Sequence, residues 1–527
     1  MGWRCVGLGR GVAILIAAAI ALCAQSSLLQ PEDFRHHVEF LNRYDAEDGN
    51  GGIPNREAWE WMKANVPFFA CPDSQVELTY YYRWWAYRKH IETTPRGFVI
   101  TEFLKPVKHA TEFNAISCAL GLQINEGRWL RDRRYLDDYV KFWLHGGEGG
   151  GLQPHYHQFS NWTADALYDR WLADGEAKSL LAELPALLAD CAAWDRERLT
   201  PSGLYWQRDV SDGMESSISG GRREKNLRPT INSYMYGNAR ALAAIAGLAG
   251  DAKLRAEYRE KAAKLKKLVE GRLWDADAQF FETVKEAGGF ANVREEAGYT
   301  PWYFDLPEPG KGYESAWKQL MDPAGFHAPF GPTTAERRHP EFLSEQHDDC
   351  QWNGFTWPFA TSITLRALAN LLNDNIQAVI SKADYFQTFL QYARSQQRKL
   401  DNGESIPWVD EDMNPLTGEW WARALKMKKP GFYGRGDHYN HSSFADLVIT
   451  GVVGLRPQAG NRVEVNPLVP EGSWDWFALD RVPYHGHLLS IAWDRDGRHF
   501  GRGKGLRLYV DGKEIAQSAT LGKIEGQ

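Results

Sequence analysis

Two kinds of helical pattern alternate along the centre of the chain. Residues 176–194 and 252–274 carry apolar side chains three and four positions apart, which predicts amphipathic helices with one buried face. Residues 231–250 and 359–374 are apolar on nearly every side, which is typical of helices surrounded by protein. This alternation predicts a mainly α fold over residues 76–454, an (α/α)6 toroid in which an inner ring of buried helices lies inside an outer ring.

The pattern changes at about residue 455. Residues 455–527 alternate apolar and polar positions and are interrupted by Asp-Gly pairs, which are the signal of β-hairpins. A small antiparallel, β-sandwich-like C-terminal domain is therefore expected there. Residues 25–75 form a mixed N-terminal segment without a dominant period.

The first residues have the pattern of an export signal. Arg4 and Arg10 precede an apolar run from Val12 to Cys23, and small polar residues follow it. The run is too short to span a bilayer comfortably, so residues 1–24 are expected to be a signal peptide that is removed on export. No second apolar run of membrane-spanning length follows, so we expect a secreted or periplasmic protein without an integral membrane span.

The overall charge indicates which classes of molecule the protein is not expected to bind. A formal net charge of -7 argues against binding to nucleic acid, because proteins that bind polyanions usually carry a basic face. Aromatic residues make up 13% of the chain and include 22 Trp, which is a high content. A large core would account for these residues, and so would flat apolar platforms in a cleft that stack on the rings of a ligand.

Four segments are unusually polar and aromatic for the ends of buried helices. They are residues 212–220 with the following 228–238, residues 348–359, residues 408–421 and residues 434–447. Loops that join the inner and outer helices of a toroid gather at one mouth. We therefore expect these four segments to form a single cleft with aromatic walls and carboxylates at its rim.

Three of these segments carry a family resemblance. "SDGMESSIS" resembles the SGxDxSxR loop of the trehalase and family 63 glycoside hydrolase group, and "QWNGFTWPFATSITLRALANLL" resembles its WxGPxWPxxNxxLxxAL segment. "EDMNPLTGE" resembles the ENYNPxTG loop, and "NHSSFADLVITGVVGLRP" is similar to the last barrel helix of related six-hairpin glycosidases. The resemblance covers roughly residues 75–470 and includes the mannosylglycerate hydrolase-like members of the group.

The resemblance implies an inverting exo-glycosidase that uses two carboxyl groups. Such an enzyme needs one protonated carboxyl to donate to the leaving oxygen and one carboxylate to activate water. The acid of the family corresponds to Glu215 and the base to Glu411. The family more often has Asp at the first position, so Asp212 and Asp209 stay open as alternative acids.

Other residues of the four segments are candidates for sugar binding. The roles predicted for them are stacking on sugar faces, hydrogen bonding to sugar hydroxyl groups and clamping of the acid loop. The candidates are Trp352, Asn353, Trp357, Gln351, Arg228, Asn232, Trp408, His438 and His441.

The identity of the sugar and two other functional classes stay open. The resemblance implies α-linked glucose or mannose, whereas the C-terminal part of the barrel is closer to bacterial relatives acting on arabinofuranosides or rhamnosides. A polysaccharide lyase or epimerase on the same toroid would depend on His438, Tyr439 and His441, and a carbohydrate-binding protein would need no catalytic carboxyl. No cofactor or metal is predicted, because the two histidines have no third ligand at suitable spacing.

Overall fold

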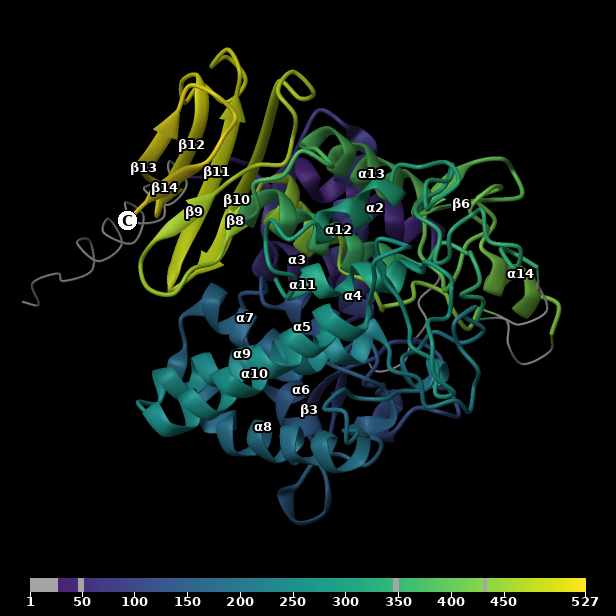
Figure 1. The fold of residues 1–527 in the computed structure, drawn as a ribbon. Helices are drawn as coiled ribbons and strands as arrows, with labels where there is room; N and C mark the ends of the chain where they lie inside the picture. The colour runs from purple at the N-terminus through teal and green to yellow at the C-terminus, as the bar shows by residue number, and fades with distance from the viewer. Residues whose placement is uncertain (1–26, 46–51, 345–349, 430–433) are drawn as a thin grey trace, which may run out of the picture.

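The computed structural model describes residues 27–45, 52–344, 350–429 and 434–527. The predicted export signal lies outside these residues and remains a prediction. The described chain forms a helical body with a β-sheet domain at one side (Figure 1). Within these ranges no helix is both long and apolar enough to cross a bilayer.

The helices fall into the two kinds that the sequence predicts. The buried, inner kind comprises α4 (Ser74–Lys89), α5 (Leu120–Gly127), α7 (Thr163–Asp174), α9 (Pro229–Leu248), α12 (Pro358–Asp374) and α15 (Phe444–Leu447). The outer kind exposes one face and comprises α6 (Arg134–His145), α8 (Ala177–Arg198), α10 (Ala252–Arg272) and α13 (Lys382–Ser395). Shorter helices are α2 (Arg35–Tyr44), α3 (Ala58–Asn65), α11 (Thr300–Tyr303) and α14 (Trp421–Lys426).

The contrast between the two kinds follows directly from composition. Helix α9 is buried along most of its length, and its Gly237 allows the ring of Phe304 to pack directly on its backbone. Helix α10 buries only a stripe and exposes its lysines and arginines. The two helices pack against each other, which gives one inner and outer pair of the predicted toroid.

A buried ion pair joins the first inner helices to the last. Arg83 on α4 donates from Nη2 to Glu126 Oε2 on α5 at 3.2 Å, and both side chains are fully buried. The other oxygen of Glu126 accepts the main-chain N–H of Ala445 in α15 at 2.7 Å. Arg83 also donates to the carbonyl oxygen of Ser442, which precedes α15, at 3.0 Å. One arginine and one glutamate thus close the ring of helices.

A second polar link lies one helical turn further along. Asp446 of α15 accepts from Arg128 Nη2 and from the indole N–H of Trp129, each at 2.8 Å. Buried charges are stable only when paired and hydrogen-bonded. The start and end of the helical domain are therefore held by paired buried charges as well as by apolar packing.

The predicted C-terminal β-domain is present. One sheet has the strand order β1-β10-β11-β12-β13, and a smaller sheet has the order β14-β9-β8. The strands are β8 (Leu455–Arg456), β9 (Val463–Val465), β10 (Trp476–Tyr484), β11 (His487–Asp494), β12 (Gly505–Val510), β13 (Lys513–Ser518) and β14 (Ile524–Gly526). Asp511 and Gly512 join β12 to β13 with φ values of 49° and 80°, which is the conformation that a tight two-residue hairpin requires.

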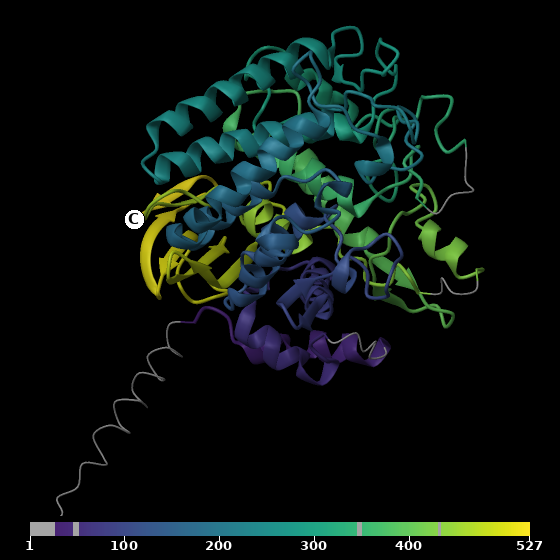
Figure 2. The same ribbon diagram turned by 90° about the horizontal axis from the view of Figure 1, so that it is seen from below.

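The N-terminal segment is more closely tied to this domain than the sequence indicates. Strand β1 (Phe68–Ala70) lies within residues 25–75, yet it pairs antiparallel with β10, with Phe68 opposite Asp480. Asp480 also accepts the main-chain N–H groups of Leu28 and Leu29, each at 3.0 Å. In Figure 2 the purple N-terminal segment runs along the helical body towards the yellow sheet. Strand β1 therefore forms one edge of the larger C-terminal sheet.

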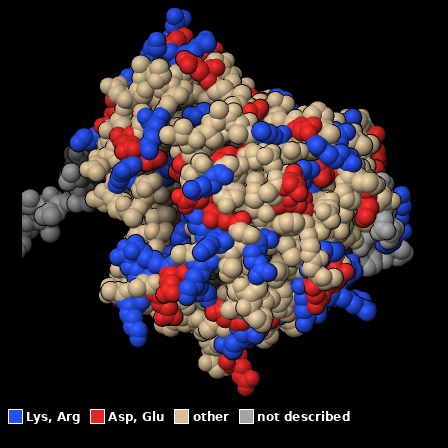
Figure 3. Space-filling view, viewed as in Figure 1, with Lys and Arg blue, Asp and Glu red and all other residues tan. Residues whose placement is uncertain are grey.

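Short two-stranded ribbons occupy the loops of the helical domain. They are β2 (Ile91–Thr94) with β3 (Gly97–Ile100), β4 (Trp274–Asp275) with β5 (Phe280–Phe281), and β6 (Gln397–Lys399) with β7 (Ser405–Pro407). On the face of the molecule shown in Figure 3, acidic and basic side chains are interspersed. That face carries no continuous basic surface of the kind that binds nucleic acid.

The ring-closing ion pair gives the first prediction. Replacing Glu126 by Gln leaves the Arg83 charge buried without its counter-charge, so we expect the free energy of unfolding to fall by about 3–5 kcal/mol. Chemical denaturation followed by circular dichroism measures this change. Glu260→Gln is the matched control, because the Glu260–Lys264 pair is 66% and 71% exposed and solvent screening leaves such a pair little effect on stability. Equal effects of the two substitutions would contradict the assigned role.

Candidate active site

A cavity of about 310 Å³ lies where the loops between inner and outer helices meet. Among the predicted site residues, Glu215, Glu411, Trp352, Trp357 and His441 line it. These residues come from all four of the polar, aromatic segments of the sequence. The structure therefore brings both predicted catalytic carboxyl groups into one cavity.

Glu215 lies in a loop that buried polar groups hold in place. Asp212 accepts hydrogen bonds from Arg228 Nε at 2.8 Å and from the Thr230 hydroxyl. The side chain of Met214 is buried in the core, as the polar sequence around it requires if the loop is to be anchored. Gly213 has a φ of 70°, and a Cβ atom there would lie 2.5 Å from the Cys118 sulfur. This close approach needs a glycine and turns Glu215 towards the cavity.

The environment of Glu215 suits a group that carries a proton near neutral pH. The pKa of Glu215 is raised to about 7, chiefly by burial and to a smaller extent by the negative charges of Glu411 and Asp209, while its own backbone hydrogen bond and the Arg222 guanidinium act in the opposite direction. Desolvation penalises the ionised form of a carboxyl group. Glu215 therefore exists in both protonation states in the pH range in which most enzymes work.

The loop that carries Glu411 has an internal scaffold. The side chain of Asn414 accepts the N–H groups of Leu416 at 3.0 Å and Thr417 at 3.2 Å. Gly418 has a φ of 74°, and a Cβ atom there would lie 2.4 Å from the Phe330 ring. The Asn-Pro-x-Thr-Gly pattern thus builds a tight turn, since Asn folds onto its own backbone and Gly supplies the left-handed conformation.

Glu411 is paired with a buried cation. Its Oε1 accepts from Lys426 at the end of α14, and both side chains are at most 2% exposed. Its Oε2 lies 3.5 Å from the Cys350 sulfur. The adjacent Asp412 accepts the N–H groups of Gln351 at 3.2 Å and Ala422 at 2.9 Å. The lysine and this backbone network fix the position of the carboxylate.

Aromatic rings form one wall of the cavity. Trp352 and Trp357 stack with their ring centroids 4.6 Å apart and an interplanar angle of 18°. His441 lies against Trp357 at 5.8 Å and stacks on Phe359 at 6.2 Å. Such flat apolar surfaces, with polar atoms at their edges, suit the faces of sugar rings.

Several predicted site residues have partners outside the cavity lining. Asn232 exchanges hydrogen bonds with the main chain of Tyr205 at 2.8 Å. Asp212 and Arg228 pair with each other, as described above. Asp212 and Arg228 thus hold the Glu215 loop and Asn232 holds the main chain at Tyr205, while the acid role of Asp212 and the substrate contacts of Arg228 and Asn232 remain predictions.

Trp408 and His438 also lie outside the cavity lining. Trp408 lies between the guanidinium groups of Arg398 and Arg423, whose central carbons are 4.1 and 4.8 Å from its ring centroid. His438 contacts the Tyr82 hydroxyl at 2.9 Å and Asp45 Oδ1 at 3.1 Å. These contacts support the Glu411 and 434–447 loops, and the predicted sugar contacts of both residues remain predictions.

Gln351 and Asn353 are buried on either side of Trp352 but do not belong to the cavity lining. The carbonyl oxygen of Gln351 accepts the indole N–H of Trp357 at 2.7 Å. The carbonyl oxygen of Asn353 accepts the N–H of Leu343 at 2.9 Å. Their main chains thus position the two tryptophans.

Sequence reasoning missed several residues that line the cavity. They are Glu102, His109, Phe359, Arg222 and Arg435, and Tyr439 was considered only for a lyase or epimerase. Glu102 follows the apolar strand β3, and a carboxylate directly after such a run was the available signal. Nothing in the sequence places residues 102 and 109 next to residue 411, because the toroid brings them together only by closing.

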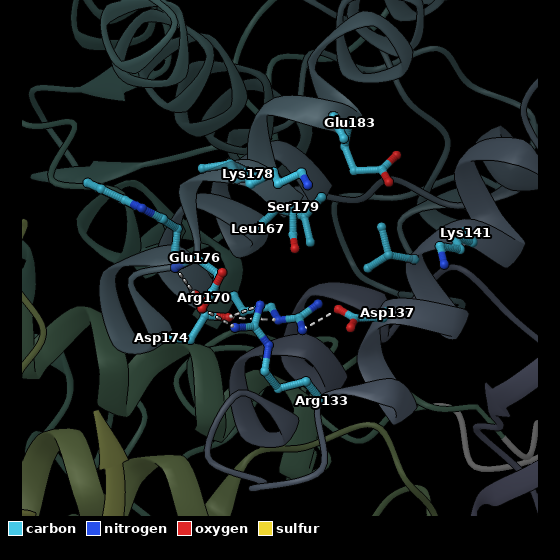
Figure 4. Close-up of a pocket in the computed structure, with 14 residues that line it drawn as sticks. Arg133, Asp137, Lys141, Leu167, Arg170, Asp174, Glu176, Lys178, Ser179 and Glu183 are labelled. Carbon is cyan, nitrogen blue, oxygen red and sulfur yellow. Dashed lines mark hydrogen bonds and ion pairs between the residues drawn. The ribbon is translucent and has the colours of Figure 1, made fainter. Parts of the chain in front are cut away.

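A second cavity, of about 400 Å³, lies between α6, α7 and α8 (Figure 4). Its Arg133 and Arg170 both pair with Asp174, at 3.1 and 3.3 Å, and Arg170 also pairs with Asp137 at 2.5 Å. These paired charges lie at the surface between outer helices. They offer no buried carboxyl group for acid catalysis, so the cavity of Glu215 and Glu411 is the candidate active site.

The described ranges contain no group of three His, Cys, Asp or Glu side chains arranged to hold a metal ion. Cys71, Cys118, Cys191 and Cys350 are free thiols. The functional chemistry visible in the cavity is that of carboxyl groups.

Comparison with known proteins identifies the family. Residues 112–442 match the model of the mannosylglycerate hydrolase MGH1-like glycoside hydrolase domain. This match covers more than half of the chain and contains both Glu215 and Glu411. The chain belongs to this glycoside hydrolase family. Residues 455–516 match the C-terminal domain of glycosyl hydrolase family 65, in agreement with the β-domain.

Solved structures agree with this assignment. A protein named "Sialidase" is 46% identical with a TM-score of 0.91, and the match covers 96% of this chain and 45% of that one. The MGH1-like chain therefore spans less than half of that protein's length. A GH78 family rhamnosidase of Bacillus sp. GL1 is 13% identical with a TM-score of 0.53, covering 84% of this chain and 41% of that one. An uncharacterised conserved protein from Thermus thermophilus is 14% identical with a TM-score of 0.50, covering 70% and 98%. The last two show a shared fold.

Membership of the MGH1-like family confirms the predicted six-hairpin glycosidase fold and the hydrolase class. The family favours the hydrolase prediction over the lyase or epimerase and the non-catalytic binding protein. Glycoside hydrolases act on carbohydrates, so the family agrees with the predicted carbohydrate substrate. The roles of the individual residues remain predictions.

The Glu411–Lys426 pair gives the second prediction. Lys426→Met removes the buried cation that fixes the Glu411 carboxylate, and a displacement of about 1 Å at a catalytic group can cost about 100-fold in rate. We expect kcat to fall by about that factor, measured on whichever glycoside the wild type hydrolyses. Lys428→Met is the control, because Lys428 is exposed. A Lys426→Met protein that retains the wild-type kcat would contradict a positioning role.

Proposed function

We propose that this MGH1-like protein is an exo-acting, inverting glycoside hydrolase in which Glu215 is the general acid and Glu411 the general base. The observation that carries the proposal is that a partly buried carboxyl group, Glu215, and a buried one, Glu411, from loops far apart in sequence, line one cavity in unlike surroundings. Unlike surroundings are what separate an acid from a base among chemically identical groups.

The two environments assign the roles. Glu215 lies among apolar and acidic groups that keep its proton near neutral pH, so it can protonate the leaving oxygen. Glu411 pairs with Lys426, so a fixed positive charge balances a carboxylate that accepts a proton from water. In an inverting hydrolase the two groups act from opposite faces of the sugar ring, with water between the base and the anomeric carbon.

The size of the cavity supports action at a chain end. Ligand pockets range from about 300 to 1,000 Å³, and this cavity, at about 310 Å³, is at the small end of that range. A small cavity with stacked tryptophans favours one terminal sugar over a long internal stretch of polysaccharide.

Hydrolysis of an acidic sugar is the second candidate, and two observations favour it over a neutral arabinofuranoside or rhamnoside. Arg222 and Arg435 line the cavity, and guanidinium groups are well suited to carboxylates. A protein 46% identical to this chain bears the name sialidase, which denotes hydrolysis of an acidic sugar, although this chain spans 45% of it. Acidic sugars therefore belong in any substrate test beside glucosides and mannosides.

The first 24 residues lead us to propose export from the cytoplasm. The basic start, the short apolar run and the small residues after it support this location. Expression of the full chain, followed by N-terminal sequencing of the exported product, tests it.

The third prediction tests the two carboxyl groups. Neutral and acidic nitrophenyl glycosides and oligosaccharides are offered to the wild type, Glu215→Gln and Glu411→Gln, and NMR follows the anomeric proton of the released sugar. We expect one class of sugar to be released with inverted configuration. Each substitution should lower kcat on the oligosaccharide by about 10²–10⁴-fold, the usual contribution of a general acid or base.

The leaving group separates the two roles. Nitrophenolate needs little protonation, so Glu215→Gln should retain much more activity on the nitrophenyl glycoside than on the oligosaccharide, whereas Glu411→Gln should lose both. Asp212→Asn is the control within the same loop, and it should affect folding stability more than the ratio of the two activities. Release with retained configuration would contradict the mechanism.

The fourth prediction concerns pH. A general acid must be protonated before the reaction, so kcat should fall as pH rises through about 7, the pKa of Glu215, and then about tenfold per pH unit. The alkaline limb should be absent from the residual activity of Glu215→Gln on the nitrophenyl glycoside. An unchanged limb in that variant would assign the titration to another group.

A further inference from the structure

A third carboxyl group lines the same cavity. Glu102 follows strand β3 and is 3% exposed. Its main-chain carbonyl oxygen accepts the N–H of Asn440 at 2.9 Å, which ties it to the segment that carries Tyr439 and His441. The Tyr439 hydroxyl donates to Glu102 Oε1. The side chain is therefore held by one oxygen.

The other oxygen has no protein partner. Within the described residues, Glu102 Oε2 is buried and makes no hydrogen bond, and the same holds for both ring nitrogens of His441. Both side chains line the cavity and are 3% exposed. Buried polar groups are nearly always hydrogen-bonded, so these atoms are suited to bind the polar atoms of a ligand.

We propose that Glu102 is a third functional carboxyl group of the cavity, which binds a sugar oxygen as a neutral carboxylic acid and is positioned by Tyr439. The inference rests on the proposed hydrolase function. The cavity would then contain, besides the acid Glu215 and the base Glu411, a third residue, Glu102, that determines substrate specificity.

The surroundings of Glu102 favour the neutral form. Its pKa is raised to about 8, chiefly by burial and to a smaller extent by repulsion from Glu411 and Glu215, while the Tyr439 hydrogen bond and the Arg435 charge act in the opposite direction. The titratable and charged groups around it are Tyr439, Glu411, Glu215, Arg435, Cys118 and Tyr139. A second negative charge beside the two catalytic carboxyl groups would be costly.

The hydrogen-bond pattern then fixes what Glu102 recognises. With Oε1 accepting from Tyr439, the proton of the neutral acid lies on Oε2, which donates into the cavity. Its partner is an acceptor, such as a sugar hydroxyl oxygen or, on an acidic sugar, a carboxylate oxygen. Glutamine has the same arrangement, because its carbonyl can accept from Tyr439 while its amide donates into the cavity.

The test compares Glu102→Gln with Glu102→Ala on the oligosaccharide that the wild type hydrolyses. Below pH 7 we expect Glu102→Gln to keep kcat/KM within about threefold of the wild type. Glu102→Ala should lose about 10–100-fold, as expected for a missing hydrogen bond to a buried polar group. A loss in Glu102→Gln as large as in Glu102→Ala would overturn the proposal, because it would mean that the charged form is required.

Binding without turnover isolates the titration of Glu102. Calorimetry in the Glu215→Gln background, where Glu215 no longer titrates, should show the Kd of the same oligosaccharide rising above pH 8. The Glu102→Gln/Glu215→Gln double variant should lack this rise. Tyr439→Phe in the same background should move the rise to higher pH, since its hydrogen bond favours the ionised form. A purely structural role would move none of these, and an unchanged rise in the double variant would overturn the proposal.

A readout without ligand separates this inference from the proposed function. Infrared difference spectra at pH 7 between the wild type and Glu102→Gln should show the carbonyl stretch of one protonated carboxyl group, which is lost from the spectrum of the substituted protein. Absence of that band would overturn the neutral state of Glu102 even if hydrolysis is confirmed. If no glycoside is released but the band is present, the hydrolase proposal fails while the protonated Glu102 stands.

Discussion

The toroid depends on the ion pair between Arg83 and Glu126. Apolar packing gives each helix a neighbour, but it does not specify that α4 and α5 meet α15. The Arg83–Glu126 pair specifies that meeting, since a buried arginine and glutamate are tolerated only in each other's presence. Their remaining hydrogen bonds reach Ala445 in α15 and Ser442, which precedes α15. The loops around the cavity connect the helices that this pair joins, so the pair also determines how far apart these loops lie.

The same burial that stabilises the barrel also sets its chemistry. Glu215 and Glu102 hold protons near neutral pH because the surrounding helices exclude water from them. Glu411 instead forms an ion pair with the buried Lys426. Three identical functional groups thus acquire different properties from their neighbours, which is the separation that the proposed acid and base roles require.

Much of this could be predicted from the sequence, because the signals are local. All-round apolar helices such as α9, the Asp511–Gly512 hairpin and the Asn414–Gly418 turn follow from short-range rules. The differences between prediction and structure concern long-range neighbours. The sequence favours a sugar contact for Trp408, but its ring lies between two arginines. Glu102 was missed because its partners lie more than 300 residues away, and Tyr439 is 337 positions further along the chain.

The pairing of β1 with β10 has a consequence for synthesis of the protein. Leu29 and Asp480, which are hydrogen-bonded in the sheet region, are separated by 451 positions. While the ribosome makes the helical domain, the N-terminal residues have no strand to join. Contacts of such long sequence separation form late and slowly, so the emerging chain carries an unpaired strand edge until β10 has been made. Chaperones that bind exposed strands would therefore have to protect the N-terminal segment for the longest time.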